Sequence, residues 1–218
     1  MMRTISVSAP AQPVALALRE SLKADLGITD DSQDSRLDDL LLDASGLVLD
    51  YIGRPILDST WRDVIKIRGD EQRLSLMLGV YPVTKIMAFV PQGGAPLTPE
   101  QIADLDLMAD SGIIYPPASG PAIWSPGQYV VTYQAGYTAP SRDKDGTPQP
   151  GTLPRAISAA VLVAAKASWH AADRDPLLRS ESEQGTGSSS WSATAAGSGG
   201  LPQSAADMLA SYRSGGLR

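Results

Sequence analysis

The first apolar pattern of the chain has the period of an amphipathic helix. Apolar side chains recur every four positions, at Val14, Leu18, Leu22 and Leu26. Gly27 follows at the position where a glycine often ends a helix, and Pro13 suits a first helical turn. The pattern therefore predicts a helix over residues 13–26.

A longer pattern of the same period follows the polar segment 29–34. Its core-facing positions are Leu37, Leu40, Leu41, Ala44, Val48, Tyr51 and Ile52. Gly53 and Pro55 predict where this second helix ends. Leu42, Leu47 and Leu49 lie off the stripe, so the helix is apolar on more than one face. Two interpretations stay open: the extra face packs inside the same domain, or it forms an interface between subunits.

The hydrophobic period changes from about 3.6 to 2 in the middle of the chain. Apolar and polar side chains alternate over residues 61–67, 74–80, 86–90 and 128–134. These runs predict short antiparallel strands in a β region over residues 56–137. Thr98 and Gln101 fit a capping box for a short helix, and residues 110–112 predict a hairpin turn.

Helical spacing returns at Pro154. Residues 154–172 carry a narrow stripe of mostly small side chains, which predicts a helix that another helix can approach closely. Residues 177–200 are rich in Gly and Ser without an apolar period, a composition typical of a flexible linker. Apolar residues of 201–218 then fall on one side of a short helix. We expect that helix to dock on a partner or to fold back on its own subunit.

Together these patterns predict an α+β fold with a mainly helical core. The core comprises the two N-terminal helices and the long helix near 154–172, with a small antiparallel β region inserted between them. The predicted domains are a core over residues 1–176, a flexible linker over 177–200 and a tethered C-terminal docking helix over 201–218.

Composition and charge exclude several classes of function. The chain has 218 residues and a net charge of −6, and its first fifty residues hold most of that negative excess. A broad basic face for gripping nucleic acid is therefore not expected. The chain has no cysteine and one histidine, His170, which excludes thiolate chemistry and every metal motif that needs two histidines. No secretory leader or membrane-spanning run is predicted.

No set of residues in the sequence predicts a catalytic centre. Asp38, Asp39 and Asp43 crowd the start of the second helix, and we interpret them as solvated charge. A carboxylate-dependent hydrolase stays as an alternative, because burial of a pair such as Asp39 and Asp43 would separate their pKa values. Trp191, alone in a polar segment, is a candidate anchor for a partner's pocket. We expect no cofactor and no metal site.

An ordered set of segments carries a resemblance to a known family. These segments are the helix end Tyr51-Ile52-Gly53-Arg54, the strand start Pro82-Val83, and the phrase VTYQAGY at 131–137 ahead of a helix that begins at a proline. Over about residues 15–172 the sequence resembles the head-to-tail connector, or adaptor, proteins of long-tailed bacteriophages and gene-transfer agents. The loop 138–153 and the Gly/Ser segment are longer than in the compact form of that family.

The resemblance implies a non-enzymatic virion protein of the phage neck, made in the host cytoplasm. Such an adaptor forms a ring, normally a dodecamer, under the portal protein. It extends the DNA ejection channel and offers a docking face to a stopper or tail-completion protein. Double-stranded DNA passes through without specific binding, and no membrane takes part. Another neck protein, a stopper or a tail terminator, is the alternative, although those proteins are mostly β.

Three groups of residues are expected to serve this role. Leu42, Leu47 and Leu49 are assigned to the subunit interface. Docking on the portal or a neighbour is assigned to Trp191, Leu201, Met208, Leu209, Tyr212 and Arg213. Asp38, Asp39 and Asp43 are expected to face the channel, where negative charge repels phosphates and lets the duplex slide.

Overall fold

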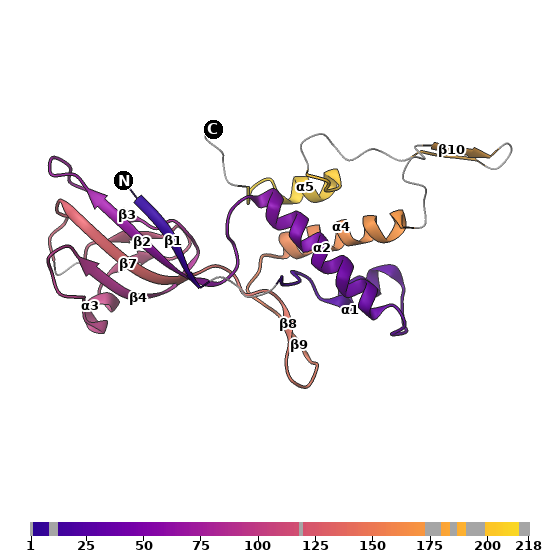
Figure 1. Ribbon diagram of the computed structural model, residues 1–218, viewed down its shortest axis with the longest axis horizontal. Coiled ribbons are helices and arrows are strands. Elements are labelled where there is room, and N and C mark those ends of the chain that lie inside the picture. Colours follow the sequence, from indigo (N-terminus) through magenta and orange to yellow (C-terminus); the bar gives the residue numbers. More distant parts are fainter. Residues whose placement is uncertain are drawn as a thin grey trace. The chain divides into compact units, whose positions relative to one another are not determined.

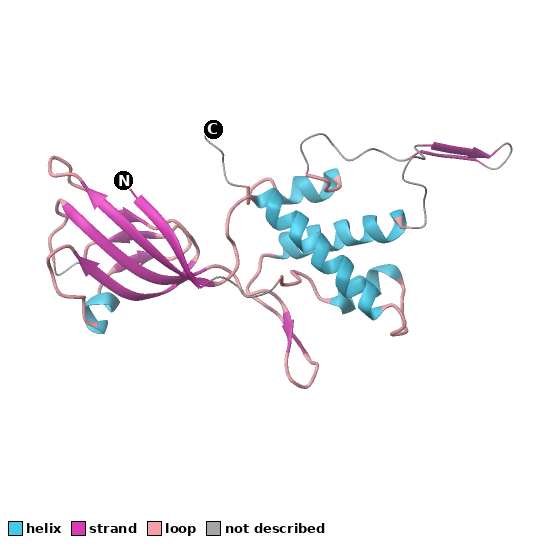
Figure 2. Ribbon diagram, in the orientation of Figure 1, coloured by secondary structure: helices cyan, strands magenta, loops and turns pink. Residues whose placement is uncertain are grey.

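The computed structural model describes residues 2–8, 13–117, 120–172, 180–183, 187–190 and 199–213. The chain forms two compact units, coloured by sequence in Figure 1 and by secondary structure in Figure 2. The β unit comprises Met1–Ala11 and Pro55–Thr138, and the helical unit comprises Gln12–Arg54 and Ala139–Arg218. The β region expected at 56–137 thus lies in a unit that also contains the N-terminal strand.

Two antiparallel sheets build the β unit. The larger has the order β1 (Met2–Ser8), β2 (Ser59–Ile67), β7 (Gly127–Ala135) and β4 (Val83–Pro91). The smaller has the order β3 (Leu76–Met77), β6 (Ile113–Tyr115) and β5 (Asp106–Met108). The short helix α3 (Pro99–Ala103) begins with the predicted capping box of Thr98 and Gln101. The turn predicted at 110–112 joins β5 to β6.

The alternation of side chains along the strands sets the core of the β unit. On β7, Tyr129, Val131, Tyr133 and Ala135 are buried and the residues between them are half-buried. The register places Ile65 of β2 opposite Tyr129, so both side chains point to the same face. The run predicted as a strand over 74–80 is a strand only at Leu76–Met77. Of its alternate apolar residues, Leu76, Leu78 and Val80 are buried as expected, whereas Leu74 is exposed.

The described part of the helical unit contains α1 (Arg19–Leu26), α2 (Asp34–Ile52), α4 (Arg155–Ala171) and α5 (Gln203–Leu209). Helix α2 contacts each of the other three, and α4 also contacts α1 and α5. Two small hairpins belong to the same unit: β8 (Ser141–Arg142) with β9 (Pro148–Gln149), and β10 (Ser180–Glu183) with β11 (Gly187–Ser190). None of the described helices is long and apolar enough to cross a membrane.

The predicted second helix and the predicted helix after Pro154 are both present, as α2 and α4. On α2 most of the predicted core-facing residues are buried, at Leu37, Leu41, Ala44, Val48 and Ile52, whereas Leu40 and Tyr51 are half-buried. Gly53 ends the helix with a left-handed φ of 67°, a conformation that glycine adopts without steric cost. The buried stripe of α4 contains Ala160, Ala164 and Ala165, and such short side chains allow close approach of another helix.

Helix α1 begins at Arg19, six residues after the predicted start. Leu16 and Ala17 are buried in a non-helical segment, and the backbone N–H of Leu16 donates to Ser45 Oγ at 2.9 Å. Leu18 has extended dihedral angles. The four-residue spacing of the first apolar residues therefore predicted the helix start wrongly. The residues before Arg19 are placed by this tertiary hydrogen bond and by burial.

The expectation of a mainly helical fold is wrong. Strands and helices hold similar shares of the described chain, and the four-stranded sheet has a hydrophobic core of its own. The N-terminal residues 2–8, which the sequence reading did not assign to a strand, add an edge strand to that sheet. Helix α5 packs against α2 and α4 because burying Leu201, Ala205 and Leu209 removes its apolar side from water.

Candidate functional site

The predicted interface leucines lie on α2 beside its buried stripe. Leu42, Leu47 and Leu49 are all half-buried, whereas Leu41 and Val48 on the stripe are fully buried. Helix α2 contacts α1, α4 and α5 within the same unit. A role of these leucines in subunit contacts stays a prediction.

The three acidic residues assigned to a channel are exposed in the first half of α2. Asp38 forms an ion pair with Arg19, whose Nη1 lies 2.5 Å from Asp38 Oδ2. Asp39 and Asp43 are also exposed, so this pair lacks the burial that an acid–base pair of carboxylates would need. The hydrolase hypothesis depended on that burial.

Basic residues of α1 compensate part of the acidic charge at the start of α2. Lys23 Nζ lies 2.7 Å from Asp31 Oδ1 and 2.8 Å from Asp34 Oδ1. The hydrogen bond from Lys23 lowers the pKa of Asp31, and the same bond raises the pKa of Lys23. Arg19 lies 3.1 Å from Asp34 as well. The count of acidic residues in the sequence therefore overstates the negative charge that this surface presents.

The assigned docking residues on and before α5 include two that are inaccessible. Leu201 and Leu209 are fully buried in the helical unit, and Met208 is 40% exposed. Docking of the two leucines on another protein requires α5 to leave its position against α2 and α4. Trp191 lies outside the described residues. The docking role of this group stays a prediction.

The residues after α5 contact the C-terminal end of α2. Arg54 Nε donates a hydrogen bond to the Tyr212 carbonyl oxygen at 3.1 Å. The Arg213 guanidinium lies 5.1 Å from the centroid of the Tyr51 ring, within the range of a cation–π contact. These two contacts hold the segment after α5 against the end of α2.

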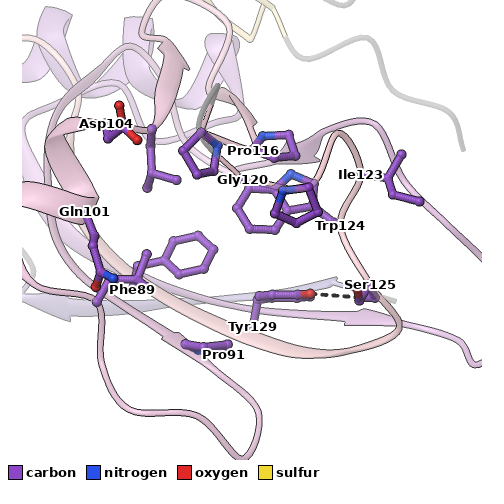
Figure 3. A pocket seen from close by; sticks show the side chains of 14 residues that line it. Phe89, Pro91, Gln101, Asp104, Pro116, Gly120, Ile123, Trp124, Ser125 and Tyr129 are labelled. Atoms are coloured by element: carbon purple, nitrogen blue, oxygen red, sulfur yellow. Dashed lines mark hydrogen bonds between the residues drawn. The ribbon is translucent and has the colours of Figure 1, made fainter.

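A pocket of about 380 Å³ opens in the β unit, and the sequence analysis did not find it. Three aromatic rings line it: Phe89 from β4, Tyr129 from β7, and Trp124 from the segment before β7 (Figure 3). The Phe89 and Trp124 rings stack with 5.3 Å between centroids, and Trp124 meets Tyr129 edge-on at 5.4 Å. Prolines complete much of the wall, at Pro91, Pro116, Pro117 and Pro121.

The polar atoms of these rings are already hydrogen-bonded. Trp124 Nε1 donates to the Ile114 carbonyl oxygen at 3.2 Å, and the Tyr129 hydroxyl donates to the Ser125 carbonyl oxygen at 2.8 Å (Figure 3). Asp104 is the one charged residue among those that line the pocket. The described lining is mostly apolar and thus suits an apolar side chain.

Asp63 in the β unit is fully buried, although alternation on β2 predicts an apolar residue there. Asp63 Oδ2 accepts hydrogen bonds from the Gly79 N–H at 2.7 Å and from the Tyr133 hydroxyl at 3.0 Å. The Tyr133 oxygen accepts one from the Val80 N–H at 3.1 Å. Burial, with the Asp63 charge as a second cause, raises the pKa of Tyr133, so the phenol remains a donor. We interpret this network as a structural tie between β2, β7 and residues 79–80.

The described residues contain no candidate metal centre. No group of three His, Cys, Asp or Glu side chains within those ranges is placed to hold a metal ion. What the structure offers instead is a set of apolar surfaces, on α2, on the seat of α5 and in the aromatic pocket.

The comparisons with known proteins reveal a shared fold. No family model and no curated protein matches the sequence. The chain is similar to one in the neck of an empty GTA particle computed with C6 symmetry, with 15% identity and a TM-score of 0.50 over 99% of this chain and 97% of that chain. Chains of the native gene transfer agent virion and of the native GTA neck computed with C12 symmetry match over the same shares, with 15% and 16% identity and TM-scores of 0.49.

Proposed function

We propose that this protein is a structural component of the neck of a phage-like particle, and within the neck the adaptor between portal and tail. The observation that carries the proposal is the fold shared with a GTA neck chain over nearly the full length of both chains. The ordered segments that resemble connector proteins support the finer assignment to the adaptor. The helical unit agrees with an adaptor better than with a stopper or tail terminator, since those proteins are mostly β.

We propose a ring as the working form, with twelve copies. The neck that contains a chain of this fold was computed with C6 symmetry, and a ring of twelve copies is compatible with six-fold symmetry. A ring of identical subunits needs two different complementary faces on each copy. The half-buried leucines of α2, Leu42, Leu47 and Leu49, are the candidates for one of these faces.

In this proposal the ring lies under the portal protein, in the virion, and double-stranded DNA passes through it. Asp39 and Asp43 are exposed on α2 and supply negative charge, which disfavours adhesion of phosphates to a channel wall. Asp38 contributes less, because Arg19 neutralises it. A stopper or tail-completion protein binds the face of the ring away from the portal. No catalytic step is assigned.

Localisation in the particle tests this proposal. The full chain, carrying a short peptide tag, is produced in the cells that make the particles, and purified particles are labelled with a tag-specific gold conjugate. We expect the label at the junction of head and tail. Particles whose capsid protein carries the same tag serve as the control for label position. Label on the capsid shell, or tagged chain found only outside the particles, would overturn the proposal.

A further inference from the structure

Helix α5 packs against α2 and α4 in the helical unit, as the arrangement of the ribbons in Figure 1 shows, and we call the surface of α2 and α4 that it covers the seat. Leu201, Ala205 and Leu209 are fully buried there. A helix of seven residues is too short to be stable alone in water, so its order depends on this seat. The seat and α5 are therefore complementary surfaces whose fit is visible within one chain.

The connection between α4 and α5 is much longer than this packing needs. Helices that pack together in bundles are usually joined by about 2–8 residues. Here residues 172–202 join two helices that contact each other. Packing within one subunit does not explain the excess length of this connection. The excess length lets α5 reach beyond its own chain.

We propose that in the assembled ring α5 of each copy occupies the α2–α4 seat of a neighbouring copy. This inference rests on the proposed ring and names one of its subunit contacts. The hairpin of β10 and β11 takes up residues 180–190, so about 20 residues of the connection lie outside it, and an extended chain covers about 3.3 Å per residue. A connection of that length suffices to reach an adjacent subunit.

The exchange keeps the same contacts but forms them between two chains instead of within one. Every apolar contact of α5, the Arg54 hydrogen bond to Tyr212 and the stacking of Arg213 on Tyr51 form equally within one chain or between two. Such domain exchange is an inexpensive route to association, and the high local concentration in a ring favours it. The occupant is a second copy of this chain, because the seat already fits α5.

Thiol crosslinking distinguishes the two arrangements, and the chain has no cysteine to interfere. The full chain carrying Tyr51→Cys and Arg213→Cys is assembled, its mass is measured under native conditions, and a short bifunctional maleimide is added. On a denaturing gel we expect a ladder of covalent multimers from the assembled ring. The same variant kept dilute and monomeric is expected to give an internally linked monomer, which shows that the pair lies within reach.

The native mass, measured before crosslinking, separates the two claims. An assembled ring that yields only internally linked monomer overturns the exchange and leaves the proposed function intact. Failure of the chain to assemble either alone or with the portal protein overturns both. Variants with one of the two cysteines control for random collisions, and we expect several-fold less multimer from them. If this double variant does not fold, the pair Arg54→Cys and Tyr212→Cys, taken from the hydrogen bond at 3.1 Å, replaces it.

Discussion

Gly136 lies where two segments of the β unit cross at very short range. Its φ is 120°, and a Cβ at this position would lie 2.4 Å from the Leu57 carbonyl oxygen. Both features exclude a side chain without movement of the backbone. We expect Gly136→Ala to reduce the free energy of unfolding by about 3 kcal/mol, as measured by urea denaturation.

Gly46 supplies the matched control, because it lies inside α2 with nothing within 4 Å of an added Cβ. Alanine loses less backbone entropy than glycine in a helix, so Gly46→Ala should raise the free energy of unfolding by about 0.5–1 kcal/mol. Equal effects of the two substitutions would contradict the close approach at Gly136.

Tyr133 is the second residue whose contribution to stability can be measured. Tyr133→Phe removes a donor to buried Asp63 and an acceptor of the Val80 N–H. Asp63 Oδ1 already lacks a hydrogen-bond partner among the described residues, so the loss leaves a buried carboxylate with one donor fewer. We expect a loss of about 1–3 kcal/mol in the free energy of unfolding, measured by urea denaturation.

Tyr129 on the same strand is the control for that substitution. Its hydroxyl donates only to the Ser125 carbonyl oxygen, and neither atom belongs to a buried charge network. Tyr129→Phe should cost no more than about 1 kcal/mol. A smaller loss for Tyr133→Phe than for Tyr129→Phe would show that the network around Asp63 adds nothing to stability.

At the scale of single elements, Asp143 holds the turn of the β8–β9 hairpin. Its carboxylate accepts hydrogen bonds from the N–H groups of Asp145 at 3.0 Å and Thr147 at 2.8 Å, and from Gln149 Nε2 at 3.1 Å. The bond from the Thr147 N–H is the main cause that lowers the pKa of Asp143 below 3.8. A lowered folded pKa stabilises the turn above the unfolded value and loses that effect as the pH falls through the folded value.

We therefore expect the titration of the Thr147 amide resonance, followed by proton–nitrogen NMR spectra, to have its midpoint below pH 3.8. Asp143→Asn should abolish this titration, since an amide carries no ionisable proton. A midpoint above 3.8 for the Thr147 resonance would mean that the turn does not hold the ionised carboxylate.

Elements with a sustained period were predictable from the sequence, and those placed by distant contacts were not. The spacing of Leu37, Leu41 and Val48 is enough to predict α2, because one face of a helix repeats every three or four residues. The start of α1 depends on the hydrogen bond between Leu16 and Ser45, 29 residues apart. Strand β1 depends on pairing with β2, more than fifty residues later.

The candidate surfaces likewise divide into those that the sequence predicts and those that it does not. The excess apolar face of α2 is visible in the sequence, since Leu42, Leu47 and Leu49 depart from the core stripe. The aromatic pocket is not, because Phe89 and Trp124 come together only when the sheet forms. Likewise, a count of acidic residues cannot reveal that Arg19 neutralises Asp38.

At the scale of the whole molecule, the α2 leucines make the proposed ring testable by mutation. Leu42 is half-buried, so Leu42→Asp should leave a folded chain and place a charge in the subunit contact. We expect size-exclusion chromatography with light scattering to show loss of the ring, with an unchanged circular dichroism spectrum. The conservative Leu42→Met should still assemble. Loss of the folded state in Leu42→Asp would place Leu42 in the core instead.

The mass of the full chain, measured alone and after mixing with the portal protein of the same particle, tests the adaptor assignment most directly. Native mass spectrometry should show a portal ring carrying twelve copies of this chain. A Leu42→Asp chain measured in parallel should leave the portal without a complete ring. A portal mass that stays unchanged in the presence of excess wild-type chain would contradict the assignment.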